Sequence, residues 1–369
     1  MIDLQRRGRN RQVTATMRAL RPGLWGEEGR ARRCLACARR CLLQRGATGY
    51  CTAIVNLDDA LYSTAYGVVS EASVTPIENR PVYHYRPGSR VLSLGGLGCN
   101  LRCLFCQNWE VAFRDARTGG GLDAPNLLPE RAVEVALEQG CDGLAWTFNE
   151  PSIAPMYTLD CARLARAAGL YTVFVTNGML TSEALDLLGP YIDVYRVDIK
   201  SLEPAFYQRV AGTARIADIF PVAVRAQQEF GIHVEAVTNL MPGCNDSDEH
   251  LSRLAERLVT RLGVSTPWHL TTYVPYAHMT DVLPTPPETL QRARAIGLRA
   301  GLRFVYTDNP AAPETANTFC PRCRALIIER GPGGVTFHAL RDDGACNCCG
   351  MALGIRRSSH APVTQKEAV

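Results

Sequence analysis

The feature that most constrains the fold is an alternation of short apolar runs with amphipathic stretches between residues 89 and 310. Repeated strand–helix units are typical of a parallel sheet, because parallel neighbours need a long, usually helical, crossover. About six or more such units predict an α/β protein whose parallel sheet curls into a full or partial barrel, with functional residues at the carboxyl ends of its strands. Strands are predicted at 91–97, 143–148, 171–176, 192–199, 232–240, 269–274 and 303–306, and helices at 129–139, 159–168, 182–188, 215–229, 247–262 and 286–300.

Cysteine-rich segments flank this barrel. We expect a basic arm and a cysteine-rich module over 1–88, the barrel over 89–310, a four-cysteine ribbon over 311–355 and a polar tail over 356–369. The chain has no run of eighteen apolar residues, so no membrane partner is expected. Its Arg-rich start lacks the apolar core of a signal peptide. A cytoplasmic location is therefore expected, in which the 15 cysteines serve as metal ligands rather than disulfides.

Three cysteines follow the first predicted strand with the spacing Cys99-x3-Cys103-x2-Cys106. A cubane iron–sulfur cluster is normally held by four thiolates, so three would leave one iron open to a small molecule. This spacing, with Phe105 before the last cysteine, resembles the signature of the radical S-adenosylmethionine (SAM) superfamily. The resemblance implies a partial barrel of the (β/α)6 type and a [4Fe–4S] cluster with SAM bound at the open iron beside Phe105. It also implies a 5′-deoxyadenosyl radical formed on reduction. The alternative is three structural thiols that share this spacing by chance.

Two further cysteine sets have the spacing of metal sites. The C-terminal cysteine set, Cys320-x2-Cys323-x22-Cys346-x2-Cys349, is similar to a zinc ribbon or rubredoxin site, and both zinc and iron accept four thiolates. The N-terminal cysteine set is predicted to bind zinc or an auxiliary iron–sulfur cluster, with reduced structural thiols as the alternative. It consists of Cys34, Cys37, Cys41 and Cys51.

Polar residues stand where predicted strands end. Asn149 and Glu150 follow the second strand, and a carboxylate there suits the ammonium group of SAM; capping of the next helix is the alternative. Asn177 follows the third strand and is assigned either to a SAM contact or to a turn. Alternation along the fourth strand places Asp198 and Lys200 inside the barrel, as a charged pair near the cofactor.

Cys244 follows the fifth predicted strand and belongs to none of the metal-type sets. A thiol at the barrel mouth can donate a hydrogen atom to a carbon radical, so Cys244 is the candidate catalytic residue. The alternative is that Cys244 acts as a small buried apolar side chain.

Most of the chain resembles one branch of the radical SAM enzymes, the pyruvate formate-lyase activating-enzyme-like proteins of the AmmeMemoRadiSam type. The matching pieces include Cys34 to Cys41, Pro76-Ile77-Glu78, Gly98 to Glu110, Asn149-Glu150-Pro151 and Asn317 to Pro321. This branch includes a sugar epimerase of avilamycin-type oligosaccharide antibiotic biosynthesis. The resemblance thus implies a carbohydrate substrate, epimerised with Cys244 as hydrogen donor, and a flavodoxin- or ferredoxin-type electron donor.

Two other functions are weighed against epimerisation. One is an activase that installs a glycyl radical on a partner protein or otherwise modifies it. The other is a zinc protein that binds RNA through its basic arm, because residues 1–50 hold 12 arginines against three acidic residues. Aromatic residues suited to base stacking are scarce in that arm, so no nucleic-acid partner is expected.

Overall fold

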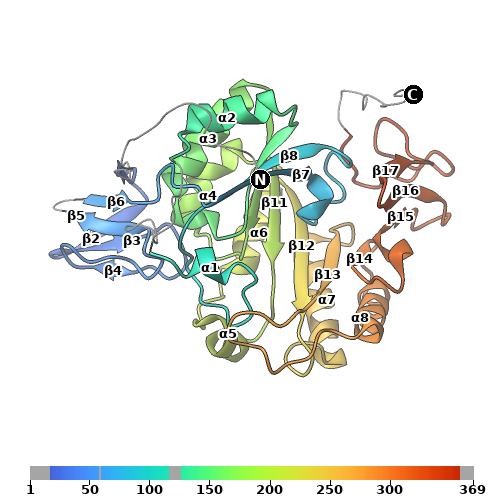
Figure 1. The fold of residues 1–369 in the computed structure, drawn as a ribbon. Coiled ribbons are helices and arrows are strands. Elements are labelled where there is room, and N and C mark those ends of the chain that lie inside the picture. Colours follow the sequence, from blue (N-terminus) through green and yellow to red (C-terminus); the bar gives the residue numbers. More distant parts are fainter. Residues whose placement is uncertain (1–16, 58–59, 116–125, 358–369) are drawn as a thin grey trace.

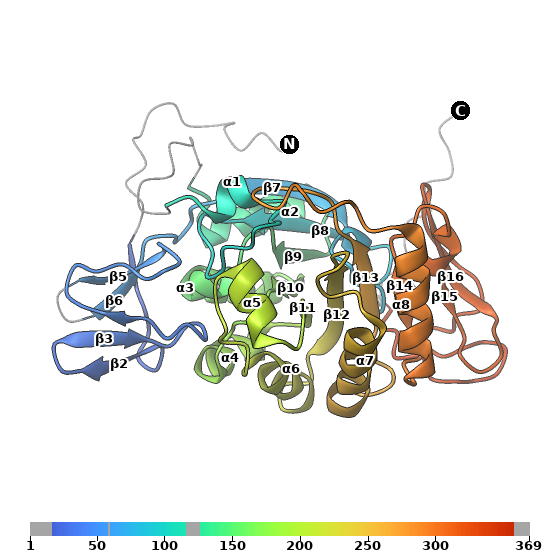
Figure 2. The same ribbon diagram turned by 90° about the horizontal axis from the view of Figure 1, so that it is seen from below.

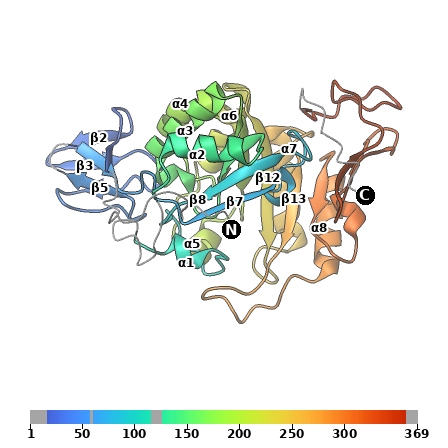
Figure 3. The same ribbon diagram turned by 45° about the horizontal axis from the view of Figure 1, so that its top comes forward.

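The computed structural model describes residues 17–57, 60–115 and 126–357 (Figure 1). The first sixteen residues of the expected basic arm and the tail from residue 358 lie outside the described residues. A curved sheet forms the centre, and a small cysteine-bearing module lies at each end of it (Figures 1 and 3). None of the helices in the described ranges has the length and apolar character needed to span a bilayer.

The central sheet has eight strands, seven of them parallel. Their order follows the sequence, from the edge strand β7 to the edge strand β14, so the barrel is partial, as the family resemblance implied. The antiparallel β7 pairs with β8 and lies N-terminal to the boundary expected at residue 88. The strands are β7 (Glu71–Pro76), β8 (Arg90–Gly95), β9 (Gly143–Trp146), β10 (Tyr171–Thr176), β11 (Val194–Asp198), β12 (His233–Leu240), β13 (Trp268–Thr272) and β14 (Val305–Thr307).

Helices cover the convex side of this sheet, seen in Figure 2 as an arc of strands with α4, α6, α7 and α8 outside it. Most begin where the sequence offers a start signal: Thr181 and Ser247 cap α4 and α7 through their side chains, and α2, α3, α5 and α8 begin with proline. The short helices α1 and α5 were not predicted. The helices are α1 (Trp109–Ala112), α2 (Pro129–Glu138), α3 (Pro155–Ala167), α4 (Ser182–Leu188), α5 (Pro204–Ala211), α6 (Ile219–Gln228), α7 (Asp248–Leu262) and α8 (Pro287–Arg299).

The inside of the barrel is divided into an apolar half and a polar half. Inward-facing valines, among them Val173 of β10 and Val194 of β11, form one buried cluster with Ile77, Val82 and Tyr85. Those last three residues come from the segment between β7 and β8, which closes the amino-terminal end of the barrel. The opposite end, at the carboxyl ends of the strands, is left for polar side chains.

Each end module contains short antiparallel strands. The N-terminal module (residues 17–63) has two three-stranded sheets, and its apolar side chains join the main core of the barrel. The C-terminal module (residues 315–357) packs Ile327 and Ile328 against Phe304 and Tyr306 beside the sheet edge. Their strands are β1 (Arg18–Ala19), β2 (Trp25–Glu28), β3 (Ala31–Cys34), β4 (Leu42–Leu43), β5 (Ile54–Leu57), β6 (Ala60–Ser63), β15 (Thr318–Phe319), β16 (Leu326–Gly331) and β17 (Gly334–Phe337).

Candidate active site

A cavity with an empty volume of about 1560 Å³ lies at the carboxyl ends of the parallel strands. It is lined by the three cysteines that follow β8 and by polar residues that follow the next strands. Every residue predicted from the sequence to contact the cofactor therefore faces the same space as these cysteines. The predicted residues that line it are Cys99, Cys103, Phe105, Cys106, Asn149, Glu150, Asn177, Asp198 and Lys200.

The cysteine loop (residues 96–108) is held by hydrogen bonds from two directions. Asn149 accepts from the amide of Gly96 and donates to the carbonyl oxygen of Gly98, both at 2.9 Å. On the other side, the amides of Arg102 and Leu104 donate to carbonyl oxygens of α5 at 3.1 and 2.8 Å. Asn149 thus fixes the start of the loop, and its predicted contact with SAM stays a prediction.

Glu150 is buried and bonded to the end of the neighbouring strand. Its carboxylate accepts from the hydroxyl of Thr176 at 2.9 Å, from the amide of Asn177 at 2.8 Å and from the amide of Ser152 at 3.0 Å. The bond to Ser152 caps the short 3₁₀ helix Pro151–Ile153, as the alternative interpretation predicted. Burial raises the pKa of Glu150 although these donors oppose the shift. Glu150 therefore ties β9 to β10, and its predicted bond to the SAM ammonium is untested.

Asn177 connects the end of β10 to the cysteine loop. Its side-chain nitrogen donates to the side-chain oxygen of Asn100 at 2.7 Å and lies 3.9 Å from the sulfur of Cys99. Its side-chain oxygen accepts from the amide of Met179, which shapes the turn after the strand. Both roles assigned from the sequence, a turn and a neighbour of the cofactor site, are compatible with this position.

Asp198 lies between two cations on the inner face of β11. The side chains of Arg196 and Lys200 approach its carboxylate at 3.2 and 3.4 Å. Burial alone would raise the pKa of Asp198, but Lys200 and Arg196 outweigh it and the pKa is lowered. Burial likewise opposes the charge on Lys200, yet Asp198 raises the pKa of this amine. The predicted inward pair is thus present, ionised, and open to the cavity.

The thiols of the cysteine loop are poor acids in the absence of a metal. Burial raises the pKa of Cys99, Cys103 and Cys106, and that of Cys103 reaches about 11. The carboxylate of Glu150 adds to the shift at Cys99, whereas Lys200 opposes it at Cys103. Because metals bind thiolates, loading this site must release protons.

The cavity is also lined by polar residues that the sequence analysis did not identify. They are Asn79, Arg80, Asn239, Thr271 and Asp308. Arg80 donates to the hydroxyl of Ser93 at 2.8 Å, and within the described residues no carboxylate lies at ion-pair distance from it. Arg80 precedes the first parallel strand in sequence, so it could not be predicted from the residues that follow strand ends.

Cys244 lies in the turn after β12, where its amide donates to the carbonyl oxygen of Met241 at 3.0 Å. The thiol is half-buried and packs against the main core. It neighbours Tyr273, whose pKa is raised first by burial and then by Cys244. Cys244 does not line the cavity in this structure, although Asn239 of the same strand does.

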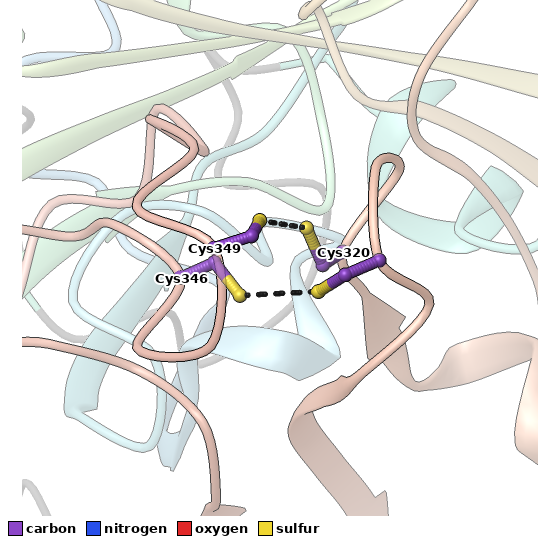
Figure 4. Close-up of side chains that lie close together, drawn as sticks. Cys320, Cys346 and Cys349 are labelled. Atoms are coloured by element: carbon purple, nitrogen blue, oxygen red, sulfur yellow. Dashed lines mark hydrogen bonds between the residues drawn. The ribbon is translucent and has the colours of Figure 1, made fainter.

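The C-terminal cysteine set converges to one point (Figure 4). All four sulfurs, from Cys320, Cys323, Cys346 and Cys349, lie within 4.8 Å of one another. The sulfur of Cys320 is 3.5 Å from that of Cys349, and the sulfur of Cys323 is 3.6 Å from that of Cys346. This is the arrangement a tetrahedral metal ion needs, as the paired spacing predicted.

Comparison with known proteins identifies the family. Residues 94–258 match the Radical SAM superfamily. Uncharacterized protein MJ0808 of Methanocaldococcus jannaschii is 35% identical over 334 residues, which cover 88% of this chain and 95% of that protein. The chain belongs to the radical SAM superfamily.

The pyruvate formate-lyase-activating enzyme of Listeria monocytogenes is 24% identical over 60% of this chain and 85% of its own. A radical SAM methyltransferase structure from Sphaerobacter thermophilus has a TM-score of 0.45 at 19% identity, and the match covers 60% of this chain and 66% of that chain.

Radical SAM enzymes use a [4Fe–4S] cluster and SAM, need an electron donor and act on a further substrate. The residues of the cavity fit the first two groups. Three cysteines on one loop offer the thiolates, and the adjacent wall carries both a buried ammonium group and carboxylates, which complement the carboxylate and ammonium groups of SAM. A radical SAM α/β fold with a C-terminal four-cysteine group is therefore confirmed.

Proposed function

We propose that this enzyme cleaves SAM reductively and removes a hydrogen atom from a polar substrate bound in the same cavity, beside Asn239 and Asp308. When bound, the cluster and SAM supply a 5′-deoxyadenosyl radical for this step. The observation that carries the proposal is that the three loop cysteines share one cavity with both charged and neutral polar strand-end residues. Its remaining space, beside Asn239 and Asp308, can take a second molecule.

The roles of the cavity residues follow from their charges. Lys200 and Arg196 offer positive charge to the carboxylate of SAM, whereas Asp198 and Glu150 offer negative charge to its ammonium group. The side chain of Asn177 is held in place by its hydrogen bond to Asn100. It therefore forms a fixed edge of the proposed SAM site. Phe105 contributes an apolar face, and the ammonium nitrogen of Lys200 lies 5.5 Å from its ring centroid.

The substrate is proposed to be a carbohydrate-containing natural product. Asn79, Asn239, Thr271 and Asp308 line the cavity and can hydrogen-bond hydroxyl groups. Arg80 adds a guanidinium group for which no described carboxylate is an ion-pair partner, which favours a substrate that also carries an anionic group.

The specific reaction proposed is epimerisation of a sugar carbon, with Cys244 as the hydrogen donor. Abstraction from one face must be followed by transfer of the hydrogen atom of the Cys244 thiol to the other face. The thiyl radical that remains then takes one electron from the proposed electron donor and one proton to restore the thiol. Cys244 follows the strand that carries Asn239, and the proposal requires the turn after β12 to move until the thiol reaches the cavity. With substrate deuterated at the reacting carbon, Cys244→Ala should still give labelled 5′-deoxyadenosine but no epimer. Full epimer yield from Cys244→Ala would exclude this donor.

An activase is the second candidate function, supported by the similarity to a protein named pyruvate formate-lyase-activating enzyme. An activase would produce a glycyl radical, visible by electron paramagnetic resonance (EPR), on a partner protein. Epimerisation would instead convert a small molecule into its epimer and leave no radical on a partner protein.

The test of the general proposal is anaerobic reconstitution with iron and sulfide, followed by reduction in the presence of SAM. We expect 5′-deoxyadenosine from the wild type and none from Cys99→Ala/Cys103→Ala/Cys106→Ala. A control variant, Cys141→Ala, should behave as wild type because Cys141 does not line the cavity. A brown wild-type protein that never forms 5′-deoxyadenosine would contradict the proposal.

Two accessory assignments complete the proposed function. Zinc is proposed for the C-terminal cysteine set, because four converging thiolates with no open position make a structural site. A flavodoxin- or ferredoxin-type protein is proposed as the electron donor.

A further inference from the structure

The N-terminal cysteine set surrounds a second, smaller cavity. Its four cysteines line a pocket with an empty volume of about 300 Å³, together with Arg39, Asn100 and Ser152. We infer that this pocket is the site of a second iron–sulfur cluster of the cubane type, rather than of a mononuclear zinc ion. The cluster would be held by Cys34, Cys37, Cys41 and Cys51.

The distances between the cysteine sulfurs distinguish a cubane cluster site from a mononuclear zinc site. A zinc ion with bonds of about 2.3 Å brings four sulfurs to within roughly 4 Å of one another. The C-terminal cysteine set meets this condition, but among the described residues no three sulfurs of the N-terminal set lie within 4.8 Å of one another. The sulfurs of Cys99, Cys103 and Cys106 do not do so either, and they belong to a cubane cluster. In a cubane each thiolate binds a different iron, so its sulfurs stand further apart.

The position of the four thiols points the same way. All four cysteines line this one pocket, so their side chains border a common space. Cys34, Cys37 and Cys51 are buried and none is disulfide-bonded. Arg39 supplies a positive charge beside what would be an anionic cluster.

The pocket also adjoins the cysteine loop of the active site. Asn100 lines the pocket, hydrogen-bonds the thiol of Cys37 and accepts from Asn177 beside Cys99. Arg39 donates to the backbone carbonyl oxygens of Asn100 and, at 2.8 Å, of Gly212. Asn100 thus contacts both the N-terminal cysteine set and the cysteine loop of the active site.

The test is to count clusters in the full-length chain after anaerobic reconstitution. The variant Cys99→Ala/Cys103→Ala/Cys106→Ala should keep about four irons and four acid-labile sulfides, with the Mössbauer spectrum of a cubane cluster. The wild type should hold about twice that amount, and Cys141→Ala should match the wild type. Adding Cys34→Ala and Cys51→Ala to the triple variant should remove all acid-labile sulfide. A mononuclear iron at the C-terminal set would add no sulfide, so it cannot imitate this result.

A triple variant without sulfide, together with a wild type that holds a single SAM-responsive cluster, would overturn the inference. So would two zinc ions per wild-type chain. Should the triple variant be insoluble, the wild-type sulfide count and its decrease by half in Cys34→Ala/Cys51→Ala decide the question. Failure of the proposed function looks different, because both clusters would then be present while 5′-deoxyadenosine is absent.

Discussion

The backbone carbonyl oxygen of Cys51 packs against Gly98, closer than any β-carbon at that position would permit. Gly98 has a φ of +85°, and it directly precedes Cys99 of the active-site loop. This contact joins the N-terminal module to the cysteine loop. Both the conformation and the space therefore require glycine at position 98.

Gly98→Ala tests this contact. We expect the variant to lose about 3 kcal/mol of stability, from the positive φ and from the clash with Cys51, and to lose iron from the cysteine loop. Gly169→Ala is the matched control, because Gly169 also has a positive φ, of +79°, but has no atom within 4 Å of the added carbon. It should lose only about 1 kcal/mol and keep its iron. Thermal unfolding and iron content measure both, and equal losses in the two variants would contradict the clash.

A second prediction concerns the ion pair between Asp198 and Lys200 inside the barrel. Asp198→Asn leaves the buried amine of Lys200 without its carboxylate, which should cost about 2–4 kcal/mol and weaken SAM binding. Adding Lys200→Met should restore part of the stability but not the SAM affinity. The control Asp342→Asn alters a fully exposed carboxylate that pairs with Arg357 and should change stability by less than about 0.5 kcal/mol. Urea unfolding and equilibrium dialysis with SAM provide the measurements.

We predict that the C-terminal cysteine set binds a metal ion and that loss of this ion affects only the C-terminal module. Cys346→Ser should weaken metal binding by more than the roughly 10–100-fold typical of outer-shell substitutions, because it removes a ligand itself. Cys348→Ser is the control, since Cys348 is exposed and lies outside the group of four sulfurs. Metal analysis after dialysis against a chelator should separate the two variants. Retention of one metal ion by Cys346→Ser would show that this thiolate is not required.

His84 predicts how stability depends on pH. Its ring nitrogen lies 2.6 Å from the hydroxyl of Tyr306, and burial lowers the pKa of this imidazole to about 3. Below about pH 6.5 the unfolded chain binds a proton at His84 that the folded chain does not. The free energy of unfolding should therefore fall by about 2 kcal/mol from pH 6.5 to pH 5.

His84→Gln should flatten this slope, whatever its effect on stability at pH 7.5. The exposed His338→Gln should keep the wild-type slope. Above pH 5 the measurement avoids the protonation of Glu235, whose buried carboxylate is held ionised by His233 and His269 despite its burial and has a lowered pKa. Thermal unfolding midpoints at several pH values suffice, and identical slopes in His84→Gln and wild type would refute the assignment.

Much of the site could be predicted from the residues that follow the ends of the predicted strands. The period-two alternation of β11 puts Asp198 and Arg196 inside the barrel, and both line the cavity. Asn149, Glu150 and Asn177 were found for the same reason, since parallel strands end at one rim. Ser247 caps α7, and such a cap depends only on residues close in sequence.

The short helix α5 and the residues Arg80 and Asp308 were missed. Arg80 enters the cavity from the segment between β7 and β8, and Asp308 from the turn after β14. Neither follows from periodicity, because each depends on where a connection lies after the sheet has curved. The position of Cys244 beside Tyr273 rather than in the cavity wall was likewise not visible in the sequence.

The sequence by itself determined the positions of the parallel strands along the chain, the three cysteine sets and the family, because these depend on local spacing and on residue type. Only the tertiary structure decided which cysteine set converges and which stays open around a cavity. The physical reason is that distances between sulfurs depend on how each module folds and on what packs against it, which spacing along the chain does not fix. The glycine that admits Cys51 next to Cys99 is one such contact.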